Sequence, residues 1–258
     1  MSVAHYPVPD SWTDRRGQFV FSIGLFAVFT MLCAMWTIRV LAVGELPTVL
    51  VSIPLGIGAG ALAVNAYRVR IADRVVPRCV WSAAGLIVLP DAKSRTLANA
   101  GIGALGIAGT AFAVLAPLHL IDLELSGGQR LIFSIAAAVA AATALTHLLM
   151  LARHGSPRVQ LGANTITIFD GMRRLDLPWD NIATIKDHPE AGRSHTGHTI
   201  CVVPESGRAY NFEQSGSYTP GGIGLFWMLR FYWSTPEARA ELGDGRAAER
   251  YLAGRFPV

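Results

Sequence analysis

The chain has 258 residues and a formal net charge of +4, and 52% of its residues are hydrophobic while only 16% are charged. Together with a mean hydropathy of +0.38, this composition excludes an ordinary soluble domain and predicts a membrane protein. The basic excess is typical of the cytoplasmic loops of membrane proteins, so we expect no nucleic-acid partner.

Four uncharged apolar segments have the length of a transmembrane helix, about 20 residues. They cover about residues 19–38, 46–66, 101–121 and 131–151, and residues 1–18 form a segment before them. Small residues let helix backbones approach closely in lipid, so their spacing predicts a compact four-helix bundle. These small residues are Gly56 and Gly60 in the second span, Gly101, Gly103 and Gly106 in the third, and Ala136, Ala140 and Ala144 in the fourth.

The basic residues predict the orientation, because Arg and Lys are retained on the cytoplasmic side. Arg15 and Arg16 precede the first span, six basic residues lie between spans two and three, and twelve follow span four. The other two loops contain only Arg39 and Arg130. We therefore expect a multi-pass protein of a bacterial plasma membrane, with both termini and the loop 67–100 in the cytoplasm.

The sequence of the middle loop, residues 67–100, indicates an internal duplication. The stretch Arg78 to Asp91 aligns with Arg158 to Gly171 at an offset of 80, close to the offset of 82 between the starts of spans one and three. This predicts two units of paired spans and a β-element, the first element reduced to a hairpin that could pack on a later β-domain. An unrelated amphipathic loop is the alternative.

Two glycine motifs resemble nucleotide-binding signatures but lack their context. "GIGALG", residues 101–106, fits the dinucleotide pattern GxGxxG, yet it opens a membrane span and follows no buried strand. "LSGGQR", residues 125–130, is the string that closes ABC-type ATPase sites, yet it falls in an outer loop and no GxxxxGK[ST] accompanies it. We expect a tight turn at Gly127 and Gly128, and no enzyme and no cofactor.

From residue 152 to the end the pattern changes to short alternating strands. At least five antiparallel strands fit between Arg158 and Phe212, with turns at Ala163-Asn164, Asp170-Gly171 and Glu205-Ser206-Gly207. The inward set is Val159, Leu161, Ile166, Ile168 and Leu175. Helices follow over residues 222–233 and 235–252, with Thr235-Pro236 and Asp244 as predicted N-terminal caps.

A strand pair with a "DG" turn followed by "LPWDNI", behind paired spans and before a terminal helix, resembles the bacterial pleckstrin-homology (PH)-like membrane proteins. The tail "FYWSTPEARAELGDGRAAERY" is similar to the ending of actinobacterial members, and the resemblance covers about Ser156 to Tyr251. It implies a bent antiparallel sheet or half-barrel closed by a helix. It implies no catalytic residues. It does imply that the domain binds lipids, peptides or partner proteins.

Two surfaces are candidate binding sites. Arg173, Arg174 and Trp179 place paired cations and an aromatic ring on one hairpin, where anionic lipid would be attracted; the alternative is a solvated turn with a core tryptophan. The second is the helix that carries Phe226, Trp227, Arg230 and Trp233, which we expect to be buried against the sheet, with some aromatics left for lipid or a partner.

The other polar groups give weaker evidence for a functional site. His188, His195 and His198, with Asp187 and Glu190, match no established ligand spacing, so we expect no metal. The most direct hypothesis is a non-enzymatic scaffold or regulatory subunit that binds a partner protein, a second copy or anionic lipid. The alternative is a small transporter or channel component that would use His147 and Asn65 in the bundle.

Overall fold

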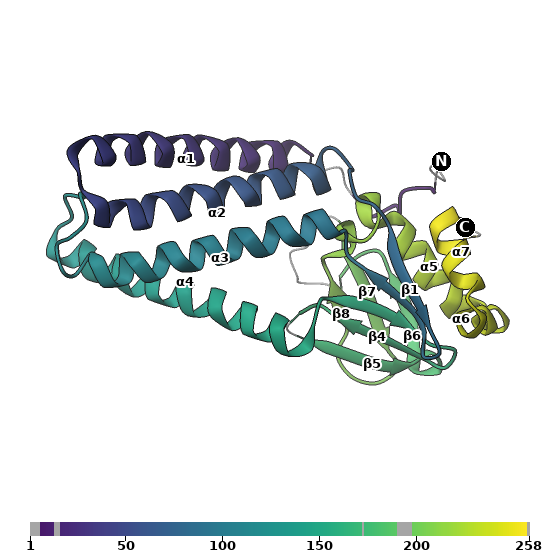
Figure 1. Cartoon of the computed structure of the whole chain (residues 1–258). Helices are drawn as coiled ribbons and strands as arrows, with labels where there is room; N and C mark the ends of the chain where they lie inside the picture. The colour runs from purple at the N-terminus through teal and green to yellow at the C-terminus, as the bar shows by residue number, and fades with distance from the viewer. Residues whose placement is uncertain (1–5, 13–15, 172, 190–197, 257–258) are drawn as a thin grey trace. The chain divides into compact units, whose positions relative to one another are not determined.

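The computed structural model describes residues 6–12, 16–171, 173–189 and 198–256 (Figure 1). The chain divides into two units. One is helical and contains residues 17–67 and 95–153; the other is rich in β-strands and contains residues 68–94 and 154–258 together with the N-terminal segment up to Arg16. The chain thus passes four times between the units.

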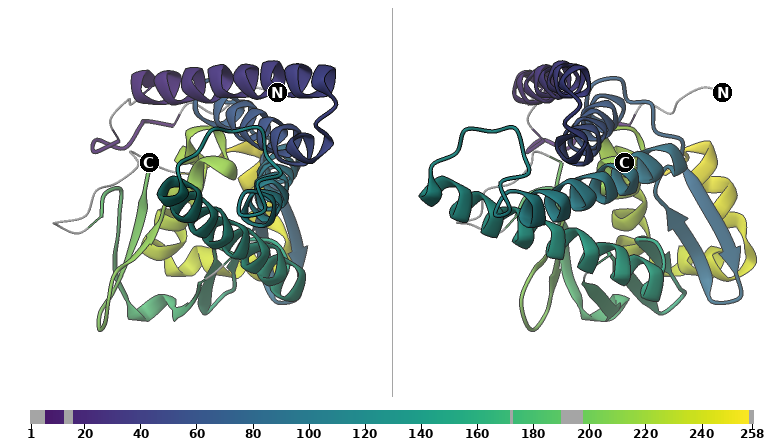
Figure 2. Two further views of the ribbon diagram at one scale, coloured as in Figure 1. Left: turned by 90° about the vertical axis from the view of Figure 1, so that its left-hand side faces the viewer. Right: turned by 60° about the vertical axis from the view of Figure 1, so that its left-hand side comes forward.

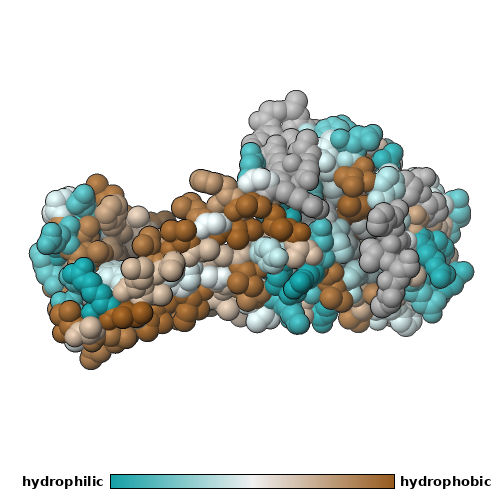
Figure 3. Space-filling model, turned by 90° about the horizontal axis from the view of Figure 1, so that it is seen from above, coloured by the Kyte–Doolittle hydropathy of each residue, from teal (hydrophilic) through white to brown (hydrophobic). Residues whose placement is uncertain are grey.

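The helical unit is built on α1 (Arg16–Val43), α2 (Leu46–Arg70), α3 (Ala92–Leu115) and α4 (Gly127–His154). All four are long and apolar enough to cross a bilayer, and brown hydrophobic side chains cover the helices in Figure 3. Figure 2 gives two further views of these helices. The four expected spans are therefore confirmed as candidate membrane helices, and the protein is a multi-pass membrane protein with a β-rich domain.

The bounds of the third helix differ from the prediction. It begins at Ala92 instead of residue 101, because Asp91 caps it: the Ser94 backbone N–H donates to Asp91 Oδ2 at 2.8 Å. It ends at Leu115 instead of residue 121, since Pro117 cannot continue a helix and disfavours helical geometry in the residue before it.

The expected tight turn at Gly127 and Gly128 is wrong, because both residues belong to the first turn of α4. Ser126 and Gln129 form a capping box: the Ser126 N–H donates to Gln129 Oε1 at 3.0 Å, and the Gln129 N–H donates to Ser126 Oγ at 3.3 Å. The motif "LSGGQR" is thus a helix start.

Glycines bring successive helices together as predicted. A Cβ placed on Gly56 would lie 3.2 Å from that of Cys33 on α1, and one on Gly60 would lie 3.4 Å from Thr30. A Cβ on Gly101 of α3 would lie 3.0 Å from Leu62 of α2. These distances show close helix–helix packing, which is the role of small residues in membrane helices.

The alanines of α4 that contact α3 differ from the predicted ones. Gly106 faces Ala144, and Gly109 faces Ala137 and Ala141. Ala136 and Ala140 are exposed, so only Ala144 of the predicted stripe lies at this contact. The contact face advances by steps of four and three residues, whereas a strict four-residue repeat drifts off one face of a helix.

The β-rich unit has two antiparallel sheets. The first contains β1 (Arg78–Ser82), β2 (Gly85–Leu89), β3 (Arg158–Leu161), β4 (Thr165–Phe169) and β5 (Arg174–Pro178), in that order. The second contains β6 (Ile182–Lys186), β7 (Ile200–Pro204) and β8 (Tyr210–Phe212). The strands and turns follow the predicted alternation, and of the inward set only Leu175 is incompletely buried.

The hairpin β1–β2 belongs to the first sheet. Leu86 of β2 pairs with Leu161 of β3, although α3 and α4 separate the two strands in the chain. The two hairpins also share one register, since Arg78 lies opposite Leu89 and Arg158 lies opposite Phe169, each pair shifted by the same 80 positions. Residues 68–94 therefore fold with the β-rich unit and not with the bundle.

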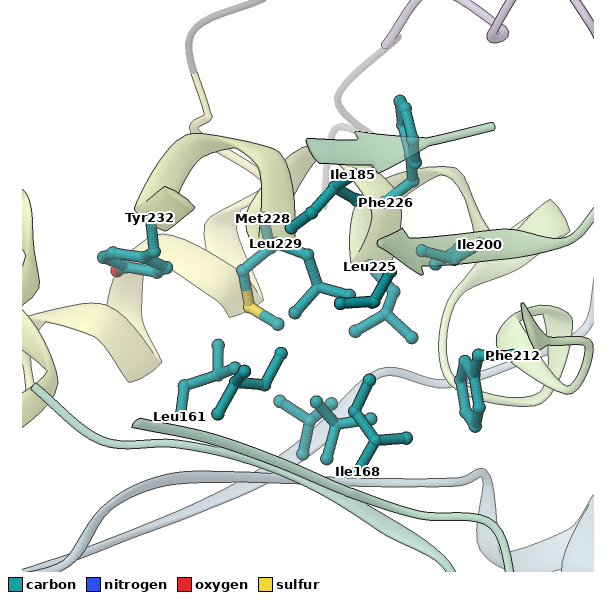
Figure 4. Packing of buried hydrophobic residues seen from close by; sticks show 14 of the residues in the cluster. Leu161, Ile168, Ile185, Ile200, Phe212, Leu225, Phe226, Met228, Leu229 and Tyr232 are labelled. Atoms are coloured by element: carbon teal, nitrogen blue, oxygen red, sulfur yellow. The ribbon is translucent and has the colours of Figure 1, made fainter. Parts of the chain in front are cut away.

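Helix α5 (Ile223–Ser234) shares the core of both sheets. Figure 4 shows Leu225, Met228 and Leu229 of α5 pointing towards Leu161 and Ile168 of the first sheet, and all five side chains are fully buried. A short 3-10 turn, Trp179–Asn181 (η1), connects β5 to β6, and two more, Ser215–Ser217 (η2) and Pro220–Gly222 (η3), lead from β8 to α5.

The C-terminal helices are shorter than predicted. They are a 3-10 turn, η4 (Pro236–Ala240), then α6 (Glu241–Asp244) and α7 (Arg246–Ala253). Pro236 starts the first as expected, but the Thr235 side chain makes no cap. Gly245 is the cap residue of α7, and Asp244 precedes it, accepting a hydrogen bond from the Arg246 N–H at 3.1 Å.

The N-terminal segment, residues 6–12, is an unpredicted part of this unit. Trp12 is 5% exposed and donates from Nε1 to the Asp187 carbonyl at 2.7 Å. Tyr6 accepts a hydrogen bond from the Phe256 N–H at 2.8 Å. The segment therefore ties the start of the chain to β6 and to the C-terminal end.

Candidate functional site

A pocket of about 250 Å³ opens between the edge strands of the two sheets, β5 and β8. It is lined by Arg173, Leu175, Arg208, Ala209, Tyr210, Asn211 and Glu213. Arg173 and Leu175 come from the β4–β5 hairpin, and the others come from β8 and the residues beside it.

The turn between β4 and β5 sets the position of Arg173. Asp170 Oδ1 accepts a hydrogen bond from the Arg173 N–H at 2.7 Å, and Gly171 has a φ of +102°, which glycine adopts without strain. The Tyr210 hydroxyl donates to Asp170 Oδ2 at 2.9 Å and so joins β8 to this turn. Burial, followed by the charge of Asp170, raises the pKa of Tyr210, so the hydroxyl stays protonated and keeps this donor role.

The pocket is cationic. Arg173 and Arg208 are both exposed, and within the described ranges neither guanidinium has a carboxylate close enough for an ion pair. Glu213 supplies the pocket's single carboxylate, and it also interacts electrostatically with Arg70, the last residue of α2. Asn211 Oδ1 is buried and accepts no hydrogen bond from the described part of the chain.

Two helix ends belong to the β-rich unit and contact residues that are close in sequence to the pocket lining. His154, the last residue of α4, packs its ring 6.1 Å from that of Phe169, just before the Arg173 turn. Three residues after Glu213, a Cβ on Gly216 would lie 3.5 Å from Val69 of α2.

The structure separates the three predicted hairpin residues. Arg174 is bound to Asp176 through its Nε at 2.6 Å, outside the pocket. Trp179 lies past the other end of β5, is 1% exposed, and donates from Nε1 to the Gly162 carbonyl at 2.8 Å. Of the two readings, the alternative of a core tryptophan is the one that holds for Trp179, and of the three predicted residues only Arg173 lines the pocket.

The second predicted surface is covered largely by the chain itself. Phe226 is 1% exposed. Trp227 is half-buried and donates from Nε1 to the Pro7 carbonyl at 2.9 Å, with Arg230 lying 5.5 Å over its ring. Trp233, also half-buried, donates from Nε1 to the Ile182 carbonyl at 2.8 Å. The N-terminal segment and β6 thus provide partners that the sequence pattern did not reveal.

Sequence reasoning missed Arg208, Asn211 and Glu213. They belong to "GRAYNFE", residues 207–213, which reads as an ordinary edge strand. Their common location depends on the pairing of β7 with β8 and on the Tyr210–Asp170 hydrogen bond, and no local motif encodes either.

The remaining polar candidates do not form a site. His188 Nδ1 lies 2.7 Å from Asp187 Oδ1, and His198 stacks on Trp12 at 5.0 Å, while His195 and Glu190 lie outside the described residues. In the described ranges no group of three or more His, Cys, Asp and Glu side chains is placed to hold a metal ion.

In the helical unit, His147 is half-buried on α4, and Asn65 Oδ1 on α2 is buried without a partner among the described residues.

Comparison with known proteins gives no match: no family model matches the chain, and neither a curated protein nor a solved structure matches it.

Proposed function

We propose that the protein is a non-enzymatic, membrane-anchored regulatory or scaffold subunit whose PH-like β-rich unit binds anionic lipid through Arg173 and Arg208. Two antiparallel sheets that share a core with α5 support the PH-like assignment. The convergence of two exposed arginines on one pocket carries the proposal, because paired guanidinium groups can bind a single phosphate group.

The charges fit a phosphate group. A guanidinium donates several hydrogen bonds in a planar arrangement that matches phosphate oxygens, and such charge-assisted bonds are stronger than neutral ones. Each basic residue near an anionic bilayer surface contributes about 1 kcal/mol of attraction. Two arginines without a carboxylate partner in the described ranges have this capacity available, whereas Arg174 already uses its charge on Asp176.

Lipid retention by the purified full-length protein tests the proposal. The protein is extracted in a neutral detergent, offered equal amounts of phosphatidylglycerol and phosphatidylcholine, and examined by native mass spectrometry. Arg173→Glu with Arg208→Glu should remove the preference for the anionic lipid, while Arg174→Glu, on the same hairpin, should preserve it. Equal retention by all three proteins would exclude the pocket as a lipid site.

A protein partner is tested on the same variants. The protein is purified gently from native membranes, and the proteins that accompany it are identified by mass spectrometry. A stoichiometric companion that is present with the unaltered chain and with Arg174→Glu but lost with the pocket variant would make the pocket a partner-binding surface instead of a lipid site.

A further inference from the structure

Resting on this proposed function, we infer that the pocket selects a phosphoglycerol headgroup, that is, a phosphodiester that carries hydroxyl donors. The two arginines account for the phosphate, but they leave two acceptors in the same pocket. These are the Glu213 carboxylate and Asn211 Oδ1.

The unpaired acceptor gives the first argument. A buried amide oxygen without a donor is costly, and a ligand that supplies a donor recovers that loss. Tyr210 cannot supply it, because its hydroxyl proton is held by Asp170. The glycerol head of a phosphodiester carries two hydroxyl groups, one for Asn211 and one for Glu213, and its carbons can lie against Leu175.

Charge gives the second argument. Two guanidinium groups and one carboxylate leave the pocket lining with a net charge of +1. A phosphoglycerol diester carries one negative charge and neutralises it. A phosphate monoester carries a charge of about −1.5 to −2, which Glu213 repels, and it brings no glycerol hydroxyls for Asn211. A phosphoethanolamine head is neutral overall and leaves the net positive charge uncompensated.

The position of Glu213 supports its role as a selecting group. It interacts electrostatically with Arg70 at the end of α2. As the carboxylate of the pocket lining, Glu213 accepts hydrogen bonds and discriminates by repelling the more highly charged monoester.

Calorimetric titration of the full-length protein in neutral detergent tests this selectivity with three short-chain lipids: phosphatidylglycerol, phosphatidic acid and phosphatidylethanolamine. Two additional hydrogen bonds, one of them to a carboxylate, predict at least about tenfold tighter binding of phosphatidylglycerol than of phosphatidic acid. Phosphatidylethanolamine also carries donors, on its ammonium group, but its neutral head leaves the positive charge of the lining uncompensated, so it should bind more weakly than phosphatidylglycerol. Glu213→Gln removes the repulsion, so phosphatidic acid should bind at least as tightly as phosphatidylglycerol. Glu205→Gln, exposed on the same sheet but outside the pocket lining, should keep the original order.

The outcomes separate the two claims. Arg173-dependent binding of all anionic lipids with no preference, unchanged by Glu213→Gln, would overturn the selectivity and leave the proposed lipid site intact. Loss of Arg173 dependence for every lipid would overturn both. Soluble glycerophosphoglycerol, added as a competitor, shows whether the ligand is soluble or part of the membrane. If it competes with the affinity of the lipid, the ligand is a soluble diester. If it fails to compete, the ligand is a membrane lipid, and the headgroup chemistry recognised is the same in both cases.

Discussion

Gly85→Ala should destabilise the β-rich unit far more than a typical glycine substitution. Gly85 begins β2 with a φ of +115°, and a Cβ there would lie 2.1 Å from the carbonyl oxygen of Leu161 on β3. Because that atom belongs to the backbone of the neighbouring strand, no side-chain rotation relieves the clash. The strand pair that joins the two hairpins must separate.

The magnitude follows from what β2 contributes. A positive φ costs an alanine about 1–2 kcal/mol wherever it occurs. Displacing β2 also disturbs Leu86 and Val88, both 0% exposed, and each buried aliphatic side chain contributes about 1.5–3 kcal/mol. Partial loss of both gives a total of about 4 kcal/mol, which for a domain of this size lowers the melting temperature by about 8–16 °C.

Gly207→Ala is the matched control, because Gly207 has a φ of +104° and no atom within 4 Å of an added Cβ. It should lose only the conformational cost, about 1–2 kcal/mol. Scanning fluorimetry of tryptophan emission in neutral detergent measures both, since Trp12 and Trp179 are buried in this unit. Melting temperatures within about 2 °C of each other would refute the close approach of β2 and β3.

Three further outcomes are expected. Trp12→Ala should lower the free energy of unfolding by about 3–5 kcal/mol, since this ring is buried and hydrogen-bonded to Asp187, and an unchanged melting temperature would show that the N-terminal segment does not pack there. The hydrogen bond from Arg250, at 2.6 Å, lowers the pKa of Glu241 below its ordinary 4.5. This pair therefore stabilises the fold above pH 4.5 and is lost as the pH falls through the lowered value, so Arg250→Gln should lose less stability than the unaltered protein between pH 5 and pH 3; equal losses would contradict the pairing. In a Cys79→Ala background, an impermeant thiol reagent should label Glu124→Cys only from outside intact cells and Ser206→Cys only after lysis, and the reverse pattern would invert the predicted orientation.

The sequence predicts the helices well because membrane crossing leaves a strong, continuous signal. Their ends were less predictable, since they depend on single capping groups: Asp91 extends α3 backwards through two basic residues, Lys93 and Arg95, that hydropathy alone assigns to a loop. The strand alternation was equally readable, because one face of each strand is buried in a common core.

The pocket could not be read from the sequence, because its residues come from the edges of two different sheets. The charge of Arg173 makes it a candidate binding residue in the sequence. Its neighbour Arg174 has the same charge, and only the ion pair between Arg174 and Asp176 in the structure distinguishes the two. Trp179 was placed with them by proximity in the chain, yet five residues of strand separate it from the Arg173 turn. Strand length, and not sequence spacing alone, decides which side chains meet.

The pairing of β2 with β3 also constrains the membrane helices. Only Pro90 and Asp91 lie between β2 and α3, and only residues 155–157 lie between α4 and β3. Paired strands lie about 4.8 Å apart, so the start of α3 and the end of α4 are tethered to neighbouring strands of one sheet through very short connections. His154, the last residue of α4, packs against Phe169 at the end of β4, just before the Arg173 turn. Under the proposed function, a ligand that fixes this turn would therefore act on the end of α4 through a contact that is already present.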